Sequence, residues 1–162
     1  MATIITIQGS YRVMEFPEAA TQSFKAFQDI CTITSSGTIN QLIAAGSDLA
    51  STAVERGIVL ALEDATGTTG NMVQCAVFDD DTRILLPVEH GTDASAVTAA
   101  TQRGATFCLT NSTATPAGWA VAIDNTTNPI CRIEQIDLSS AVGTQYGKLK
   151  VALLDTCRYP IK

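Results

Sequence analysis

The chain alternates short apolar runs with polar turns along almost its whole length, and this alternation constrains its fold more than any other feature of the sequence. Runs rich in Ile, Val, Leu and Thr, bounded by Gly, Asn, Asp and Pro, are typical of β-strands joined by turns. They span residues 3–7, 29–33, 57–63, 71–78, 84–88, 105–109, 119–123, 130–136 and 148–154. The pattern predicts a mainly β chain that folds as a single compact β-barrel or β-sandwich domain.

The N-terminal segment, residues 1–22, differs from the rest because it lacks a partner run at obvious hairpin spacing. We expect it to form an N-terminal arm on a β-rich domain of residues 23–162. Apolar side chains exposed on such an arm would need a partner surface, unless the arm folds back on its own domain. Removing residues 1–17 is then expected to weaken partner binding and to leave the fold intact. The candidate contact residues of the arm are Tyr11, Arg12, Val13, Met14 and Phe16.

Helices are expected to be few. Residues 18–28, which follow Pro17, and residues 94–102 are compatible with a helix, although the second segment is only weakly amphipathic. Residues 41–54 are compatible either with a helical turn or with a loop, since Gly46 interrupts them.

Charge and composition narrow the classes of function. Charged residues make up 16% of the chain, the net charge is -6, and the cations are scattered, so we expect no nucleic-acid partner. A polar but weakly charged surface is typical of proteins that pack in assemblies, and it also fits a stand-alone β-domain. No apolar stretch approaches the length of a membrane span, and the N-terminus does not resemble a secretory signal. We therefore expect no membrane partner and synthesis in the cytoplasm.

Motifs for catalysis or metal binding are sparse. The cysteines are Cys31, Cys75, Cys108, Cys131 and Cys157. They are widely spaced within or beside apolar runs, which indicates buried thiols rather than zinc ligands. His90 beside Glu89 could act as a general base, but a lone histidine in a turn is more often structural. The triplet 79–81 of three aspartates is interpreted as a solvated hairpin tip rather than a calcium site, because adjacent side chains on an extended backbone point in opposite directions. We expect no metal, no cofactor and no enzymatic activity.

The order of the segments resembles that of the small decoration, or cement, proteins of tailed-bacteriophage capsids. The resemblance covers about residues 23–158 and rests on patterns of hydrophobicity and turns. The segments that carry it are SFKAF at 23–27, DICTITSSGTINQ at 29–41, AAGSDL at 44–49, GIVLALE at 57–63, MVQCAVF at 72–78, AVTAATQRG at 96–104, the run that begins at Trp119, DNTTN at 124–128, CRIEQID at 131–137 and AVGTQYGKLKV at 141–151.

The resemblance implies a structural protein on the outside of an icosahedral virion. Such a protein binds the major capsid protein, commonly as a homotrimer at three-fold positions, and bridges neighbouring capsomers without an active site. The five cysteines are neither required nor explained by it. An alternative is a glycan-binding β-module of a phage tail or other surface appendage, which would use loops such as 110–118. Trp119 could serve such a module as an exposed aromatic, but it is more simply interpreted as a core anchor.

Overall fold

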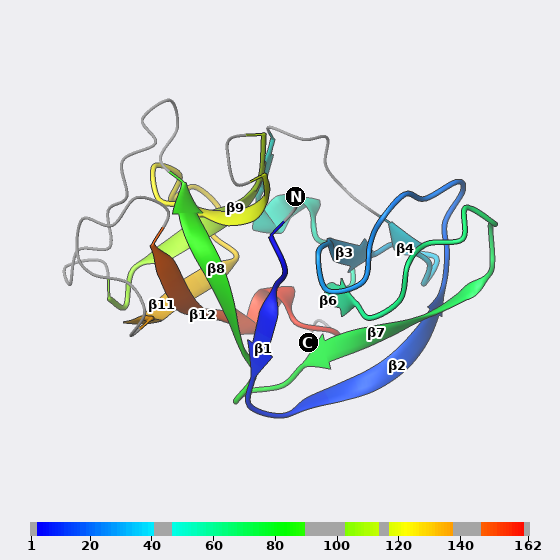
Figure 1. Cartoon of the computed structure of the whole chain (residues 1–162), viewed down its shortest axis with the longest axis horizontal. Coiled ribbons are helices and arrows are strands. Elements are labelled where there is room, and N and C mark those ends of the chain that lie inside the picture. The colour runs from blue at the N-terminus through cyan, green and yellow to red at the C-terminus, as the bar shows by residue number, and fades with distance from the viewer. Residues whose placement is uncertain (1–2, 41–46, 90–102, 114–116, 138–146, 161–162) are drawn as a thin grey trace.

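The computed structural model describes residues 3–40, 47–89, 103–113, 117–137 and 147–160. It is mainly β and consists of two sheets packed together (Figure 1), as the sequence pattern predicts. Each of the predicted runs overlaps a strand. The strands of the larger sheet are β1 (Thr6–Gln8), β5 (Asp48–Leu49), β8 (Arg83–Glu89), β9 (Thr106–Ser112), β10 (Gly118–Ala122), β11 (Cys131–Ile136) and β12 (Lys148–Leu153). Those of the smaller sheet are β2 (Tyr11–Pro17), β3 (Ile30–Ile33), β4 (Ile39–Asn40), β6 (Ile58–Ala61) and β7 (Met72–Phe78). Two single 3-10 turns, η1 (Ser51–Ala53) and η3 (Asp155–Cys157), are the other elements of the described residues.

The larger sheet closes on itself. Strand β8 pairs with β10, the order continues through β9 and β11 to β12, and β12 pairs back with β8. The residues that alternate inward along these strands are large and apolar, and they include Leu86, Leu109, Trp119 and Val151, all buried. Closure leaves these strands with a packed interior and few unpaired edges.

The smaller sheet curls around a second core. Its order is β2-β7-β6-β3-β4, and an isolated bridge between Glu18 and Ile39 brings the end of β2 back to β4. One face of the curl buries Phe16, Phe24 and the thiols of the two cysteines on β3 and β7. The other face contributes residues such as Leu60 to the core of the larger sheet. The central strands of the curl are thus buried on both sides.

The expected N-terminal arm is not confirmed. Strand β1 pairs with β8, and β2 pairs with β7 over its full length (Figure 1). Ile5 and Phe16 are buried in the two cores. The segment therefore folds back on the domain, which was the alternative left open. Removing residues 1–17 would delete two strands together with core side chains, so the expectation that the fold survives this truncation is not supported.

The helix considered for residues 18–28 is wrong. Phe24 is inserted into the second core, and nearby backbone amides are bound by side chains instead of by helical carbonyls. The amide of Lys25 donates to Asp29, and the amide of Ala26 donates to Asp64 at 2.9 Å. Within residues 41–54, the described part forms β5 and η1. The segment 94–102 lies outside the described residues.

Candidate interaction surface

Strand β2 carries all five of the residues proposed as contacts, and the structure divides them between its two faces. Tyr11 and Val13 lie on one face and are exposed by 38% and 54%. Arg12, Met14 and Phe16 alternate onto the other face. Phe16 is buried there, in edge-to-face contact with Tyr159 at a ring separation of 5.3 Å, and Met14 packs against the same core. Phe16 is therefore a core residue, whereas Tyr11, Arg12 and Val13 are open to a partner.

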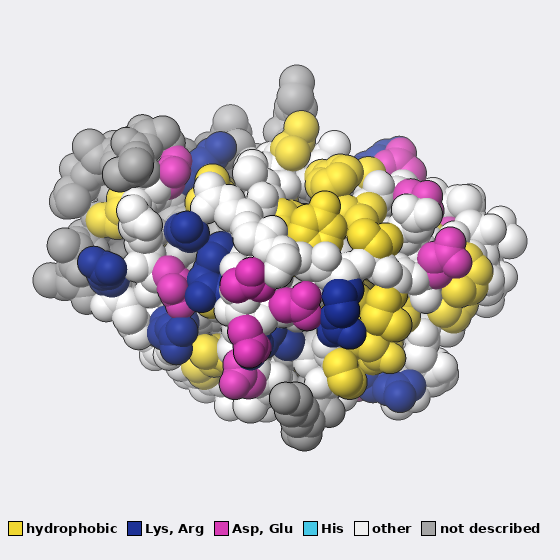
Figure 2. All heavy atoms as spheres, turned by 90° about the horizontal axis from the view of Figure 1, so that it is seen from below, with side chains coloured by type: hydrophobic (Ala, Val, Ile, Leu, Met, Phe, Trp, Pro, Cys, Tyr) yellow, Lys and Arg dark blue, Asp and Glu magenta, His cyan; other side chains and the backbone are white. Residues whose placement is uncertain are grey.

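β2 is also an edge strand. It stands at one end of the sheet order, so that among the described strands only β7 pairs along Tyr11–Pro17, and β4 bridges just to the following Glu18. Figure 2 views the molecule from the side on which β2 and β7 lie and shows hydrophobic side chains gathered there beside a band of charged groups. Met72, which lies opposite Pro17 on β7, is 48% exposed and adds to this apolar area. We call the seven residues Tyr11–Pro17 the β2 edge.

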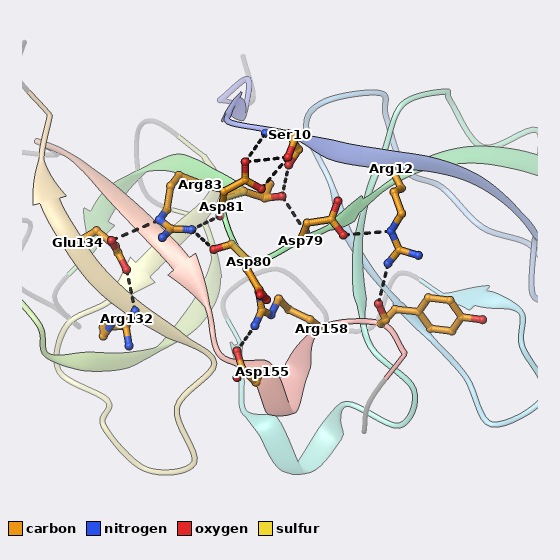
Figure 3. A network of polar contacts seen from close by, with 12 residues as sticks. Ser10, Arg12, Asp79, Asp80, Asp81, Arg83, Arg132, Glu134, Asp155 and Arg158 are labelled. Atoms are coloured by element: carbon orange, nitrogen blue, oxygen red, sulfur yellow. Dashed lines mark hydrogen bonds and ion pairs between the residues drawn. The ribbon is translucent and has the colours of Figure 1, made fainter.

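The β2 edge is held in place by a corner where two chain segments pass together from one sheet to the other. The turn at Gly9 and Ser10 joins β1 to β2, and the turn of residues 79–82 joins β7 to β8. The hydroxyl of Ser10 donates to the Asp81 carboxylate at 2.7 Å, and the hydroxyl of Thr82 donates to the carbonyl of Ser10 (Figure 3). These hydrogen bonds from Ser10 lower the pKa of Asp81 below its usual range. The corner therefore fixes where β2 begins.

The glycine at this corner cannot be replaced without movement. Gly9 has a φ of +82°, a left-handed conformation that favours glycine. A Cβ atom at this position would lie 2.2 Å from the carbonyl oxygen of Asp81. The two turns thus approach each other more closely than any side chain would allow.

Arginine side chains connect the corner to its surroundings. Arg12 donates to Asp79 at 3.0 Å and also contacts the backbone carbonyl of Tyr159. Arg158 is largely covered and pairs with Asp80 at 2.6 Å and with Asp155 (Figure 3). Because Asp80 and Asp155 are themselves almost fully exposed, these pairs contribute little stability and act mainly to position the side chains.

A second arm of the network reaches the larger sheet. Arg83 lies 3.4 Å from Glu134 and also donates to the backbone carbonyl of Asp80 at 2.7 Å. Arg132 donates to the same Glu134 at 2.8 Å. The hydrogen bond from Arg132, aided by the charge of Arg83, lowers the pKa of Glu134 despite its partial burial. The network therefore spans both sheets.

The aspartate triplet is not a hairpin tip, because β7 and β8 belong to different sheets and do not pair. The interpretation as a hairpin is wrong, although Asp80 is solvated. Each carboxylate of the triplet is engaged by an arginine or by Ser10. Within the part of the chain that the structure describes, no group of three or more acidic, histidine or cysteine side chains is arranged to hold a metal ion.

A groove of about 470 Å³ opens beside the β2 edge at this corner. Arg12 belongs to both features, since it is part of β2 and lines the groove. The walls of the groove combine charged groups with aromatic and proline rings. The lining residues are Arg12, Phe78, Asp79, Asp80, Asp81, Asp155, Arg158, Tyr159 and Pro160.

The remaining residues considered from the sequence are structural or undescribed. All five cysteines are free and buried, as predicted, and burial raises the pKa of Cys75 and Cys131 to about 12. Trp119 is fully buried, so it is a core anchor, as predicted, and not an exposed aromatic. His90 lies outside the described residues. No described helix has the length and apolar character needed to cross a membrane.

One buried carboxylate was missed by the sequence reasoning. Glu18 follows β2 directly and accepts hydrogen bonds from the amide and hydroxyl of Thr66 at 2.8 Å and from the amide of Gly67 at 3.1 Å. Desolvation raises the pKa of Glu18, but these bonds together outweigh it and lower the pKa below its usual value. Glu18 thereby organises the loop after β6. A glutamate next to a proline gives no sequence signal for this role.

Comparison with protein-family models, with curated proteins and with solved structures found no match to this chain.

Proposed function

We propose that the chain is a structural virion protein that binds the outer surface of an icosahedral phage capsid and bridges neighbouring capsomers. Its partner is the major capsid protein, and three copies assemble around a three-fold position of the shell as a homotrimer. It is made in the host cytoplasm and acts on the capsid exterior. The proposal assigns it no enzymatic activity, no cofactor and no contact with nucleic acid or membrane.

The observation that carries the proposal is the β2 edge. It presents exposed Tyr11, Arg12 and Val13 on a rigid strand, and a mixed-charge groove opens at its start. Exposed apolar groups next to unpaired backbone are typical of surfaces that bind other proteins. The partner class is proposed from the resemblance of the segment order to capsid decoration proteins.

A small contact of this kind suits a protein that acts in several copies. One strand edge buries less surface than a standard interface and binds weakly alone. Three copies joined around one axis bind together with a much higher apparent affinity, because attachment of the first raises the effective concentration of the others. Stabilisation of the shell would then follow from bridging rather than from any single strong contact.

The alternative of a glycan-binding module loses its main candidate residue. Trp119 is fully buried and cannot stack on a sugar ring. No described feature favours a sugar ligand in its place. A glycan array remains the direct measurement for this alternative, and specific binding there would replace the capsid proposal.

The test is co-sedimentation of the purified protein with expanded capsids of the phage whose genome encodes it. Val13→Lys places a charge at the centre of the β2 edge and is expected to weaken binding at least tenfold. Ile4→Lys is the matched control, because Ile4 is similarly exposed but lies before β1, outside the β2 edge; it should bind within about twofold of wild type. Failure of the wild-type protein to bind would overturn the function, and equal loss in both variants would overturn the contact site.

A further inference from the structure

We propose that, in solution, the β2 edge pairs with the β2 edge of a second copy of this chain. The two strands run antiparallel about a two-fold axis that passes beside Val13. This inference does not rest on the capsid proposal, because its partner is the protein itself. It rests on the β2 backbone N–H and C=O groups that face away from β7, on the register in which two copies can pair through them, and on the side chains that this register brings together.

The backbone of β2 presents the N–H and C=O groups of its odd-numbered residues outward. In an antiparallel ladder, residues whose backbone N–H and C=O groups bond to the partner strand alternate with residues whose backbone groups face away from it. The amide of Glu18 donates to Asn71 across from β2, which places the even-numbered residues toward β7. A hydrogen bond of Gln74 supports the same assignment. Its carbonyl accepts from the amide of Leu62 on the β6 side, so the backbone N–H and C=O groups of the odd-numbered residues of β7 face β2. The backbone N–H and C=O groups of Tyr11, Val13 and Glu15 therefore point away from β7.

Only one symmetric register pairs Tyr11, Val13 and Glu15 exclusively with one another. A two-fold axis beside Val13 pairs Val13 with its own copy and Tyr11 with Glu15, which allows about six backbone hydrogen bonds. A shift toward Arg12 sets two Arg12 guanidinium groups opposite each other, and like charges directly opposite are unfavourable. A shift toward Met14 sets Tyr11 against Pro17, which has no N–H to donate. The register beside Val13 is the self-complementary one.

The side chains of that register also match. Val13 is 54% exposed, and it would meet the second Val13 at the centre of the interface. At each end, the hydroxyl of Tyr11 lies opposite the carboxylate of Glu15, a donor facing an acceptor. Glu15 is exposed and has no hydrogen bond or ion pair within the described residues. An apolar centre is thus flanked by two identical polar pairs.

The pairing has a consequence for assembly. A two-fold pairing occupies the β2 edge of both copies, so the same contact cannot build a ring of three. If the capsid contact also uses the β2 edge, self-pairing and docking exclude each other, so the dimer is a form that protects the edge in solution and opens before docking. Covering a long edge strand is one of the ways in which proteins avoid uncontrolled strand addition.

The first experiment measures the solution mass by light scattering as a function of concentration. The interface is at the low end of specific contact areas, so the mass is expected to rise from 17.0 kDa toward twice that value at high protein concentration. Val13→Pro removes an outward N–H from the edge and leaves the β2–β7 ladder bonded; it should remain monomeric at every concentration. A wild-type protein that stays monomeric, or that forms trimers, would overturn the inference.

Disulfide trapping tests the register without depending on how well Val13→Pro folds. A bonded antiparallel pair has Cα atoms about 5.5 Å apart, which a disulfide can bridge. Val13→Cys should give a covalent dimer under mild oxidation, at least tenfold faster than Met72→Cys, whose exposure is similar. The native thiols are all buried and will not interfere. Equal rates in the two variants would indicate random collision and overturn the register, whatever the outcome of capsid binding.

Discussion

The close approach of two turns at Gly9 leads to a quantitative prediction about the corner between the sheets. In Gly9→Ala, the new methyl group would lie 2.2 Å from the Asp81 carbonyl oxygen. Real Cβ contacts are at least 3.0 Å, so the turns must separate by about 0.8 Å. That movement stretches the hydrogen bonds of Ser10 to Asp81 and from Thr82 to Ser10.

Gly104→Ala is the matched control for this substitution. Gly104 has the same φ of +82°, but no atom lies within 4 Å of a Cβ built there. In both variants the free energy of unfolding falls by about 1–2 kcal/mol, because alanine is strained in the left-handed region. Only Gly9→Ala adds the overpacking cost, about 1–3 kcal/mol for such contacts. We expect Gly9→Ala to be less stable than Gly104→Ala by that additional amount.

Urea unfolding followed by tryptophan fluorescence measures the difference. Trp119 is the only tryptophan and is fully buried, so its emission reports the loss of the core. In thermal unfolding, the additional loss corresponds to about 2–4 °C per kcal/mol for a chain of this size. Equal losses in the two variants would show that the corner relaxes freely and that the contact between the turns does not restrain the sheets.

Three further outcomes are expected. Native protein should not react with Ellman's reagent at pH 8, because burial raises the pKa of Cys108 to about 11 and that of Cys131 to about 12; rapid reaction before unfolding in urea would contradict the assignment of buried thiols. The lowered pKa of Glu18 means that its contribution to stability is present above its unfolded value of 4.5 and is lost as pH falls through the folded pKa. Glu18→Gln should therefore lower the unfolding free energy at pH 7 more than at pH 3, and a pH-independent loss would refute the role of the charge. Trp119→Phe should cost only the lost packing, about 1–3 kcal/mol, because the indole N–H has no partner among the described groups; a larger loss in circular-dichroism melts would indicate a missing hydrogen bond.

Local sequence patterns predicted most strands and the class of fold. Runs such as 71–78 and 130–136 carry their own signal, because alternation and flanking turns are properties of neighbouring residues. β2 was missed as a strand because its partner β7 lies about 60 residues away, and no hairpin spacing reveals such a pairing. The same segment had been interpreted as an arm on that ground. Two-residue strands such as β4 are too short to give any pattern.

The candidate surface was predicted only in part. The sequence suggested Tyr11, Arg12 and Val13 as contacts, and the structure leaves these three exposed. Phe16 could not be separated from them, because its burial depends on Tyr159, which is distant in sequence. The groove was not predicted either, because the segments that line it are distant from one another in the sequence.

The pairing of the N-terminal strands with β7 and β8 also determines the order in which the molecule can form during synthesis. The strands made first, β1 and β2, have to wait for residues 72–89 before either has a partner. At ribosomal speeds of about 5–20 residues per second, this delay is on the order of several seconds. During that interval the apolar start of the chain is available to chaperones or to other nascent chains, and a chain truncated before β8 would lack the strand with which β1 pairs.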